Sequence, residues 1–146
     1  VGLGEPLYGK LSASLAAAML SINAAKGFDY GNGFAAAEGY GSEQNDIFYD
    51  NNGSVATRTN NSGGIQGGIT NGMPVVFSCA VKPTPSVFKQ QNTVDFKKNE
   101  DATLNIKGRH DPCIVHRARV VADSITAIVL ADMLVSRYGT DWLCDK

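Results

Sequence analysis

Residues 113–138 read CIVHRARVVADSITAIVLADMLVSRY and carry the clearest periodicity of the chain. Apolar side chains recur in this segment at i, i+3, i+4 and i+7, the spacing that places them on one face of an α-helix. The members of this stripe are Ala118, Val121, Ala122, Ile125, Ile128, Val129 and Met133. Pro112 suits the first turn, where its missing N–H would have no partner in any case. The segment therefore predicts a helix of about seven turns.

A second helix is predicted near the start of the chain. Residues 10–26 read KLSASLAAAMLSINAAK, which is rich in alanine and leucine and contains no glycine or proline. These residue types have a high helix propensity, and Gly27 stands where a helix C-cap is favoured. We therefore expect one helix from Lys10 to Lys26.

The residues between the two helices indicate short strands. One or two are expected within residues 28–40, where two glycines interrupt an alternating pattern, and residues 73–81 predict a buried strand. Residues 91–107 alternate on either side of a charged turn, which is typical of a hairpin. Residues 42–61 are polar with little periodicity and predict a long mobile loop.

The length and composition set the fold class and exclude two classes of function. A chain of 146 residues with 43% hydrophobic residues predicts a single domain, residues 1–146, with its own core. We expect an α+β fold in which antiparallel strands are layered against the two helices. The formal net charge of -1 argues against a nucleic-acid-binding surface, which needs a cationic excess. No apolar run approaches the roughly 20 residues that span a bilayer, which argues against a membrane protein.

The cysteines indicate a reducing compartment. Three of them, Cys79, Cys113 and Cys144, form an odd set without a close pair, so no disulfide framework is predicted. Cys79 lies in an apolar run and is predicted to be a small buried hydrophobe. A cytoplasmic location follows from this pattern of cysteine use.

Two segments, one on either side of the strand predicted over residues 73–81, suit an anionic ligand. Residues 62–72, SGGIQGGITNG, are either a flexible connection or a backbone cradle in which the missing Cβ atoms admit a flat or anionic ligand. No lysine follows these glycines as a Walker A loop requires, and the G-x-G-x-x-A match at residues 31–36 lacks the strand and helix of a dinucleotide fold. Residues 82–86, KPTPS, either end a strand or grip a phosphate with one lysine and two hydroxyls.

Residues 108–113, GRHDPC, combine a guanidinium, an imidazole and a carboxylate just before the long helix. A helix N-terminus attracts anions, and Arg109 adds a bidentate donor for a phosphate or carboxylate. Asp111 is either part of this site or only the N-cap of the helix. A metal site at His110, Cys113 and His116 is disfavoured, because the two histidines point apart on a helix and no second cluster completes the ligand set. We predict no metal.

Four strings together resemble the C-terminal part of chorismate synthase. They are SINAAKGFDYGNGF at residues 21–34, SGGIQGGITNGMPV at 62–75, AVKPTPS at 80–86, and GRHDPC at 108–113 followed by IVLAD at 128–132. The strings occur in the order of that family and cover nearly the whole chain, and GRHDPC is among the family's signature motifs. The resemblance implies part of a domain with the family's β-α-β sandwich fold.

The resemblance also implies a function. Chorismate synthase is a lyase of the shikimate pathway, which leads to the aromatic amino acids. It converts 5-enolpyruvylshikimate-3-phosphate to chorismate and phosphate by an anti 1,4-elimination that requires reduced FMN, with NADPH as an associated reductant. Members of the family are typically homotetramers with active sites near the subunit contacts. The implied partner is therefore a small phosphorylated substrate, with neither nucleic acid nor membrane.

Matched residue by residue, the family's site falls on the segments that the chemistry singles out. The implied FMN contacts are Asn23, Ala24, Gly67, Lys82, Pro83, Thr84, Pro85, Ser86 and Arg109. Arg109 and Asp111 resemble substrate ligands. Asp111 also resembles the catalytic carboxylate near the flavin N5 that helps to move a proton.

One departure from the family concerns catalysis. The two catalytic histidines of the family belong to its N-terminal half, one of them in a Gly-Glu-Ser-His string, and no part of this sequence matches that string. The chain also opens at Val1 without an initiator methionine, so we expect a C-terminal fragment that is inactive by itself. The alternative is a stand-alone flavin- or phosphate-binding module that keeps the binding surface without the chemistry.

Overall fold

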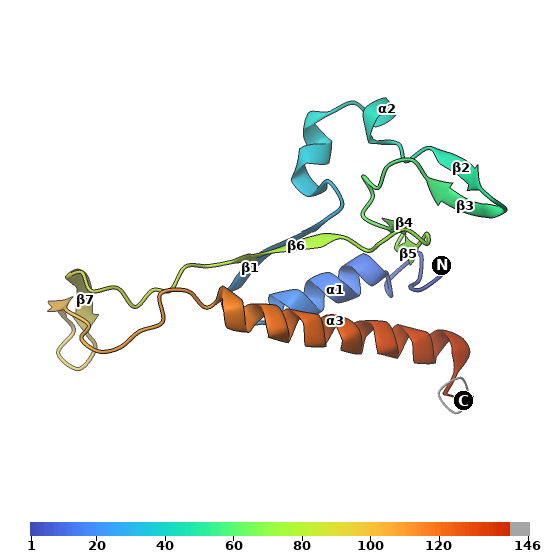
Figure 1. Ribbon diagram of the computed structural model, residues 1–146. Helices are drawn as coiled ribbons and strands as arrows, with labels where there is room; N and C mark the ends of the chain where they lie inside the picture. Colours follow the sequence, from blue (N-terminus) through green and yellow to red (C-terminus); the bar gives the residue numbers. More distant parts are fainter. Residues whose placement is uncertain (141–146) are drawn as a thin grey trace.

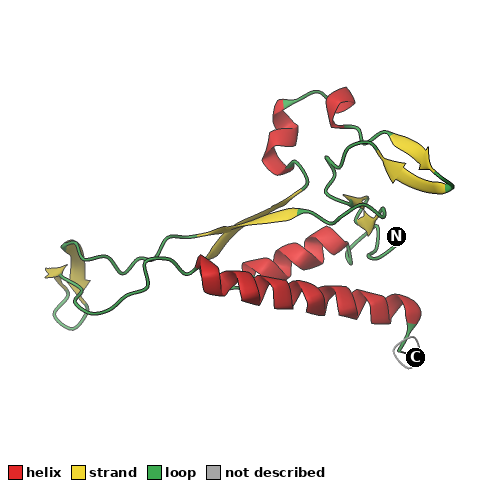
Figure 2. Ribbon diagram, viewed as in Figure 1, coloured by secondary structure: helices red, strands yellow, loops and turns green. Residues whose placement is uncertain are grey.

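The computed structural model describes residues 1–140 of the chain, and Cys144 lies outside the described residues. The chain combines helices with short strands that pair two by two in antiparallel sheets (Figure 2). The elements are α1 (Leu11–Leu20), β1 (Ala25–Tyr30), the 3-10 helix η1 (Gly33–Glu38), α2 (Gly41–Gln44), β2 (Phe48–Asn51), β3 (Ser54–Thr57), β4 (Ile65–Gln66), β5 (Ile69–Thr70), β6 (Phe77–Val81), β7 (Gln91–Asp95), β8 (Glu100–Leu104) and α3 (Val115–Tyr138). The predicted α+β class is confirmed.

The core lies where α1 packs between α3 and the β1–β6 pair (Figure 1). Leu11, Leu15 and Met19 are fully buried, and their i, i+4, i+8 spacing places them on one face of α1. Ile65 joins this cluster from β4. The partly buried side chains packed against the cluster are Phe28, Val75, Phe77, Val129, Leu130 and Met133.

The first helix is shorter than predicted. It ends at Leu20, where the Ser21 hydroxyl donates to the Ala18 carbonyl (2.6 Å), and Ala24 then adopts a left-handed φ of 69° that no helix continues through. Gly27 is not a C-cap, because it lies in β1 opposite Ala80. Pairing with a strand more than 50 residues away overrides the helix propensity of the last predicted turn.

The β1–β6 pair sets the positions of two distant segments. The strands are antiparallel, with Ala25 opposite Val81 and Tyr30 opposite Phe77. The predicted strand over residues 73–81 is confirmed for its second half, but its side chains are alternately half-buried and exposed rather than buried. Cys79, predicted as buried, is half-buried for the same reason.

Residues 33–57 form a lobe beside the β1–β6 pair (Figure 1). The prediction of a second strand within residues 28–40 is wrong, because the 3-10 helix η1 occupies residues 33–38. The loop predicted over residues 42–61 contains α2 and a hairpin, β2–β3, whose turn is formed by Asn52 and Gly53 with left-handed φ values of 53° and 86°. The mobility of this segment stays a prediction.

The predicted hairpin is confirmed as β7–β8. Its strands pair from Gln91 opposite Leu104 to Asp95 opposite Glu100. Figure 1 shows the hairpin as an arm that extends away from the helices. The residues that lead into and out of this arm belong to the two segments, 82–86 and 108–113, that were singled out for an anionic ligand.

The long helix is confirmed, but its start and its apolar stripe differ from the prediction. It begins at Val115, so Pro112 lies before the first turn rather than in it. Ile128 is 67% exposed, and Val121 is also exposed, whereas Ala122 and Val129 are half-buried on the side that faces α1. Over residues 1–140 no helix is long and apolar enough to span a membrane.

Candidate functional site

Two of the segments singled out by the sequence lie side by side because of the β1–β6 register. Asn23 and Ala24 precede β1, Lys82 follows β6, and Ala25 pairs with Val81. The Lys82 N–H donates to the Ala24 carbonyl oxygen at 2.8 Å. The left-handed turn at Ala24 therefore holds the start of the 82–86 segment directly.

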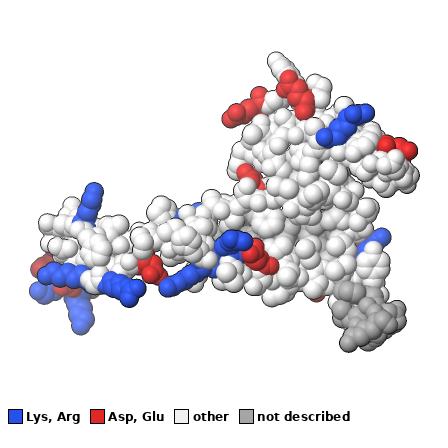
Figure 3. Space-filling model, in the orientation of Figure 1, with Lys and Arg blue, Asp and Glu red and all other residues white. Residues whose placement is uncertain are grey.

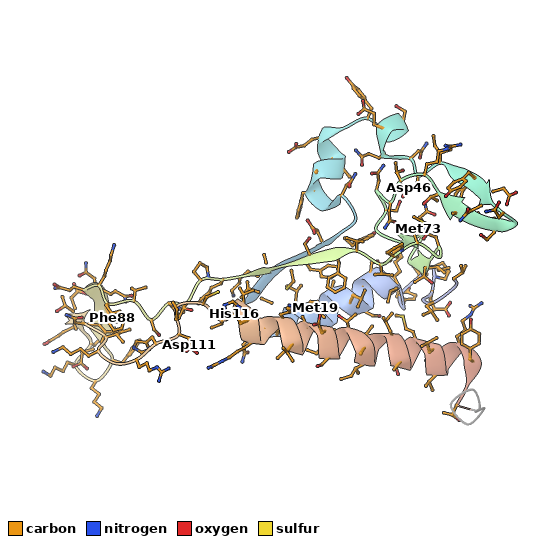
Figure 4. All side chains as sticks on the ribbon, viewed as in Figure 1. Met19, Asp46, Met73, Phe88, Asp111 and His116 are labelled. Atoms are coloured by element: carbon orange, nitrogen blue, oxygen red, sulfur yellow. The ribbon has the colours of Figure 1, made fainter. Side chains whose placement is uncertain are left out.

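The third segment is joined to the residues after the 82–86 segment by an aromatic contact. The rings of Phe88 and His110 have centroids 5.7 Å apart and planes inclined by 52°. Figure 4 shows Phe88, Asp111 and His116 following one another from the arm to the start of α3. The turn at Asn23 and Ala24 thus lies beside the start of the 82–86 segment, and the 108–113 loop meets the residues that follow this segment, further out toward the arm (Figure 4).

Two buried polar atoms at the base of the arm lack hydrogen-bond partners within residues 1–140. They are the Thr84 hydroxyl oxygen and the His110 Nε2 atom. Buried polar groups in folded proteins are nearly always hydrogen-bonded, so an unsatisfied pair in one region calls for an explanation. A polar ligand at this position would supply the missing partners.

The cationic groups of the site are exposed. Lys82 and Arg109 are solvent-exposed, and neither takes part in an ion pair within the described part of the chain. Figure 3 shows lysine and arginine side chains gathered on the arm and along its base. Exposed cations without carboxylate partners are free to bind an anion.

Asp111 is not the N-cap of α3. The N-cap residue is Ile114, and no side chain caps the helix there. The Asp111 carboxylate instead accepts from the Arg117 guanidinium at 2.8 Å, with side chains that are 46% and 80% exposed. An ion pair this exposed contributes little stability.

The histidines and cysteines do not form a metal site in the described region. Within residues 1–140 no three side chains of the metal-binding types come together. His110 faces Phe88 rather than His116, which lies in the first turn of α3. Cys113 is exposed just before that turn.

A comparison with protein families identifies the chain's relatives. The model of the family described as chorismate synthase matches residues 1–135. The chain belongs to the chorismate synthase family. The resemblance carried by the four strings is therefore confirmed.

Curated chorismate synthases from distant organisms are similar to the chain. Those of Bacteroides fragilis, Archaeoglobus fulgidus and Methanocaldococcus jannaschii are 53%, 52% and 50% identical over 132, 134 and 136 residues. The matches cover 90%, 92% and 92% of this chain but 37%, 37% and 36% of the relatives. The chain therefore spans a little over a third of the length of these chorismate synthases.

A solved structure agrees with the sequence comparison. A crystal structure of chorismate synthase superimposes on the chain with a TM-score of 0.74 at 35% identity. The superposition covers 94% of this chain and 34% of that chain. The fold is accordingly that of a part of the chorismate synthase structure, as predicted.

Gly67 lies apart from the other residues that the chorismate synthase resemblance selects. It sits in the turn between β4 and β5, and the next residue, Gly68, accepts a hydrogen bond from the Leu11 N–H at the start of α1 (2.9 Å). Asn23 follows the other end of α1, and a ten-residue helix is about 15 Å long. Gly67 borders a separate cavity of about 580 Å³ that includes Phe34 and Gln66.

Asp46 is a buried carboxylate that the sequence does not single out. It connects the lobe of residues 33–57 to the loop that precedes β4. Asp46 is 6% exposed and accepts hydrogen bonds from the Thr59 hydroxyl (2.7 Å) and from the Asn61 and Ser62 N–H groups (2.7 and 2.8 Å). Burial alone raises its pKa, but the hydrogen bonds from Thr59, Ser62 and Asn61 outweigh that effect and hold the pKa below its ordinary value. Figure 4 shows Asp46 inside the lobe.

Proposed function

We propose that this chain forms the part of a chorismate synthase active site that binds reduced FMN and the phosphate of the substrate. The reaction is the anti 1,4-elimination that converts 5-enolpyruvylshikimate-3-phosphate to chorismate and phosphate. The observation that carries the proposal is that two contacts link the three segments one after another. The Lys82 N–H donates to the Ala24 carbonyl oxygen, and the Phe88 ring contacts the His110 ring.

The residues present at the base of the arm fit a flavin phosphate ligand. The Thr84 hydroxyl and the His110 Nε2 atom are buried polar atoms without partners in residues 1–140, and Lys82 and Arg109 are exposed cations. FMN carries hydroxyls, ring nitrogens and a dianionic phosphate, which are the groups that such donors and acceptors bind. Reduced flavin, when bound, lends electron density to the end of the substrate that loses phosphate and then recovers it.

The chain's own residues then act on the substrate and its protons. The Arg109 guanidinium donates two parallel N–H bonds to the departing phosphate, which stabilises the negative charge that grows as the C–O bond breaks. Asp111, oriented by Arg117 at 2.8 Å, is the carboxylate that accepts or returns a proton near the flavin. Asn23 and the 82–86 segment hold the ligand in place.

The whole reaction needs more than these residues. The chain spans 37% of the length of the Bacteroides fragilis relative, and no string of its sequence matches the family's catalytic histidines. We therefore expect the 146 residues alone to form no chorismate. At the relatives' full length we propose a cytoplasmic homotetramer that uses NADPH-derived electrons to keep its flavin reduced.

A chimera tests flavin binding without relying on the short chain. Residues 1–135 replace the matching region of the Bacteroides fragilis chorismate synthase, and FMN binding is followed by flavin fluorescence. Lys82→Ala should raise the Kd for FMN about tenfold, because one charge-assisted contact to the phosphate or ring is lost. The matched control is Lys89→Ala, an exposed lysine three residues beyond the 82–86 segment, which should change the Kd less than twofold. Equal effects of the two substitutions would contradict the proposed contact.

The same titration on the 146-residue chain separates the two functional hypotheses. If the chain supplies only part of the site, its affinity for FMN should be at least tenfold weaker than that of the chimera. Micromolar binding by a monomeric 146-residue chain, equal to that of the chimera, would instead favour a self-sufficient binding module.

A further inference from the structure

Two aromatic rings lie between the parts of the proposed site. Phe88 is two residues beyond the 82–86 segment, and His110 stands between Arg109 and Asp111. Their rings meet at a centroid distance of 5.7 Å and an angle of 52°, within the range of favourable aromatic pairs. The contact therefore connects the residues that follow the 82–86 segment with the 108–113 segment.

Residues 1–140 show no second contact of a polar or aromatic kind between these two segments. Within the described residues, no hydrogen bond or ion pair links residues 82–90 to residues 105–113. The pairing of β7 with β8 begins further out along the arm, at Gln91 and Leu104. The Phe88–His110 contact is thus the link of these kinds between the two segments in the described residues.

The backbone at Gly108 is shaped to present the imidazole to Phe88. Gly108 has a φ of 135°, a conformation that side-chain-bearing residues rarely adopt. A Cβ built on Gly108 would lie 3.7 Å from the His110 Nε2 atom, so the imidazole folds back over the glycine. His110 is half-buried in this position although its Nε2 atom has no hydrogen-bond partner in residues 1–140. Ring packing rather than hydrogen bonding therefore holds the imidazole.

We propose that Phe88 and His110 form a ring clamp that positions the 82–86 segment relative to Arg109, so that both meet the same ligand. This inference rests on the proposed function for the identity of the ligand, but the clamp itself is a property of the chain. Neither residue is a catalytic group. Each acts by holding its neighbours, Ser86 on one side and Arg109 on the other, at a fixed separation.

Backbone order in the 146-residue chain tests the clamp directly. In ¹⁵N relaxation measurements, the order parameters of Thr84 and Ser86 should fall from values typical of ordered backbone, about 0.8, to below about 0.6 in His110→Ala and in Phe88→Ala. His110→Phe retains an aromatic ring and should leave both order parameters unchanged. Phe96→Ala removes a ring that is 93% exposed at the turn of the arm and serves as the control. Unchanged order in His110→Ala, or equal loss in His110→Phe, would overturn the clamp.

A second measurement links the clamp to the ligand. In the chimera, Phe88→Ala should raise the Kd for FMN about fivefold, the variant that combines it with His110→Ala should bind no more weakly than His110→Ala alone, and Phe88→Tyr, which keeps the ring, should leave the Kd within twofold. Effects of the two substitutions that multiply would overturn a shared positioning role, as would an unchanged Kd in variants whose order parameters have fallen. A parent chimera that binds no FMN would count against the proposed function alone, since the order parameters still decide the clamp.

Discussion

Replacing Asp46 with alanine should lower the free energy of unfolding by about 3 kcal/mol, measured by urea denaturation of the 146-residue chain. The carboxylate is buried and accepts three hydrogen bonds, two of them from the backbone N–H groups of Asn61 and Ser62. Alanine removes the charge-assisted hydrogen bonds and leaves their donors without a partner. Both effects lower the free energy of unfolding. The lobe should loosen from the loop that precedes β4.

A second carboxylate in the same lobe provides the matched control. Asp50 is exposed and accepts one hydrogen bond, from the Gly53 N–H at 2.8 Å, in the turn between β2 and β3. Asp50→Ala should cost less than about 1 kcal/mol, because water replaces the lost partner. If the two substitutions destabilise the chain equally, the account of Asp46 as a buried anchor is wrong.

The stability of the chain should also depend on pH through Asp46. Its pKa is lower in the folded chain than the ordinary unfolded value of about 3.9, so the folded state binds fewer protons in acid. The resulting stabilisation is fully present above about pH 4 and is lost as the pH falls through the folded pKa. Asp46→Asn cannot titrate and should show a shallower loss of stability below about pH 4, whereas an unchanged slope would contradict this assignment.

Arg109→Ala should lower kcat/KM for chorismate formation at least about 100-fold in the chimera that carries residues 1–135. In the proposed site the guanidinium is the group that binds the departing phosphate, and removing a preorganised donor from a developing charge has an effect of this size. Stability should change little, because Arg109 is exposed and has no ion-pair partner within residues 1–140. The assay is chorismate release from substrate with reduced FMN.

Arg119→Ala is the control for this loss of activity. Arg119 is an arginine on the exposed side of α3, and its contact to Asp123 is long, at 3.8 Å, with both side chains more than two thirds exposed. Its removal should change kcat/KM less than about twofold, since an exposed pair of this kind contributes little. A loss equal to that of Arg109→Ala would show that net positive charge, rather than a specific contact, governs the activity.

The sequence predicts the elements that are governed by local pattern. The stripe of α3 has a helical period over more than 20 residues, and the β7–β8 hairpin alternates on both sides of its turn, so both were located within a few residues. The end of α1 was misplaced because the local propensity of residues 21–26 favours a helix, whereas the register with β6 determines the strand. That register pairs residues that are more than 40 positions apart, so a pattern within a short stretch of sequence does not predict it.

The residues of the candidate site are predicted from the sequence, but their arrangement in space is not. Segments 82–86 and 108–113 were recognised by their chemistry and by their resemblance to one family. The contacts that link these segments to their neighbours, the Ala24–Lys82 hydrogen bond and the Phe88–His110 ring pair, have no signature in the sequence. Asp46 was missed because an aspartate in a polar stretch is usually exposed, and its partners lie 13 to 16 residues further along the chain.

The most direct test of the central claim is turnover by the chimera of residues 1–135 with the Bacteroides fragilis chorismate synthase, from which the matching region has been removed. If this chain forms the flavin- and phosphate-binding part of the active site, the chimera should release chorismate and phosphate in equal amounts, in a reaction that requires reduced FMN, within about tenfold of the parent rate. A chimera that folds with the thermal stability of the parent and yet forms no chorismate would contradict the account.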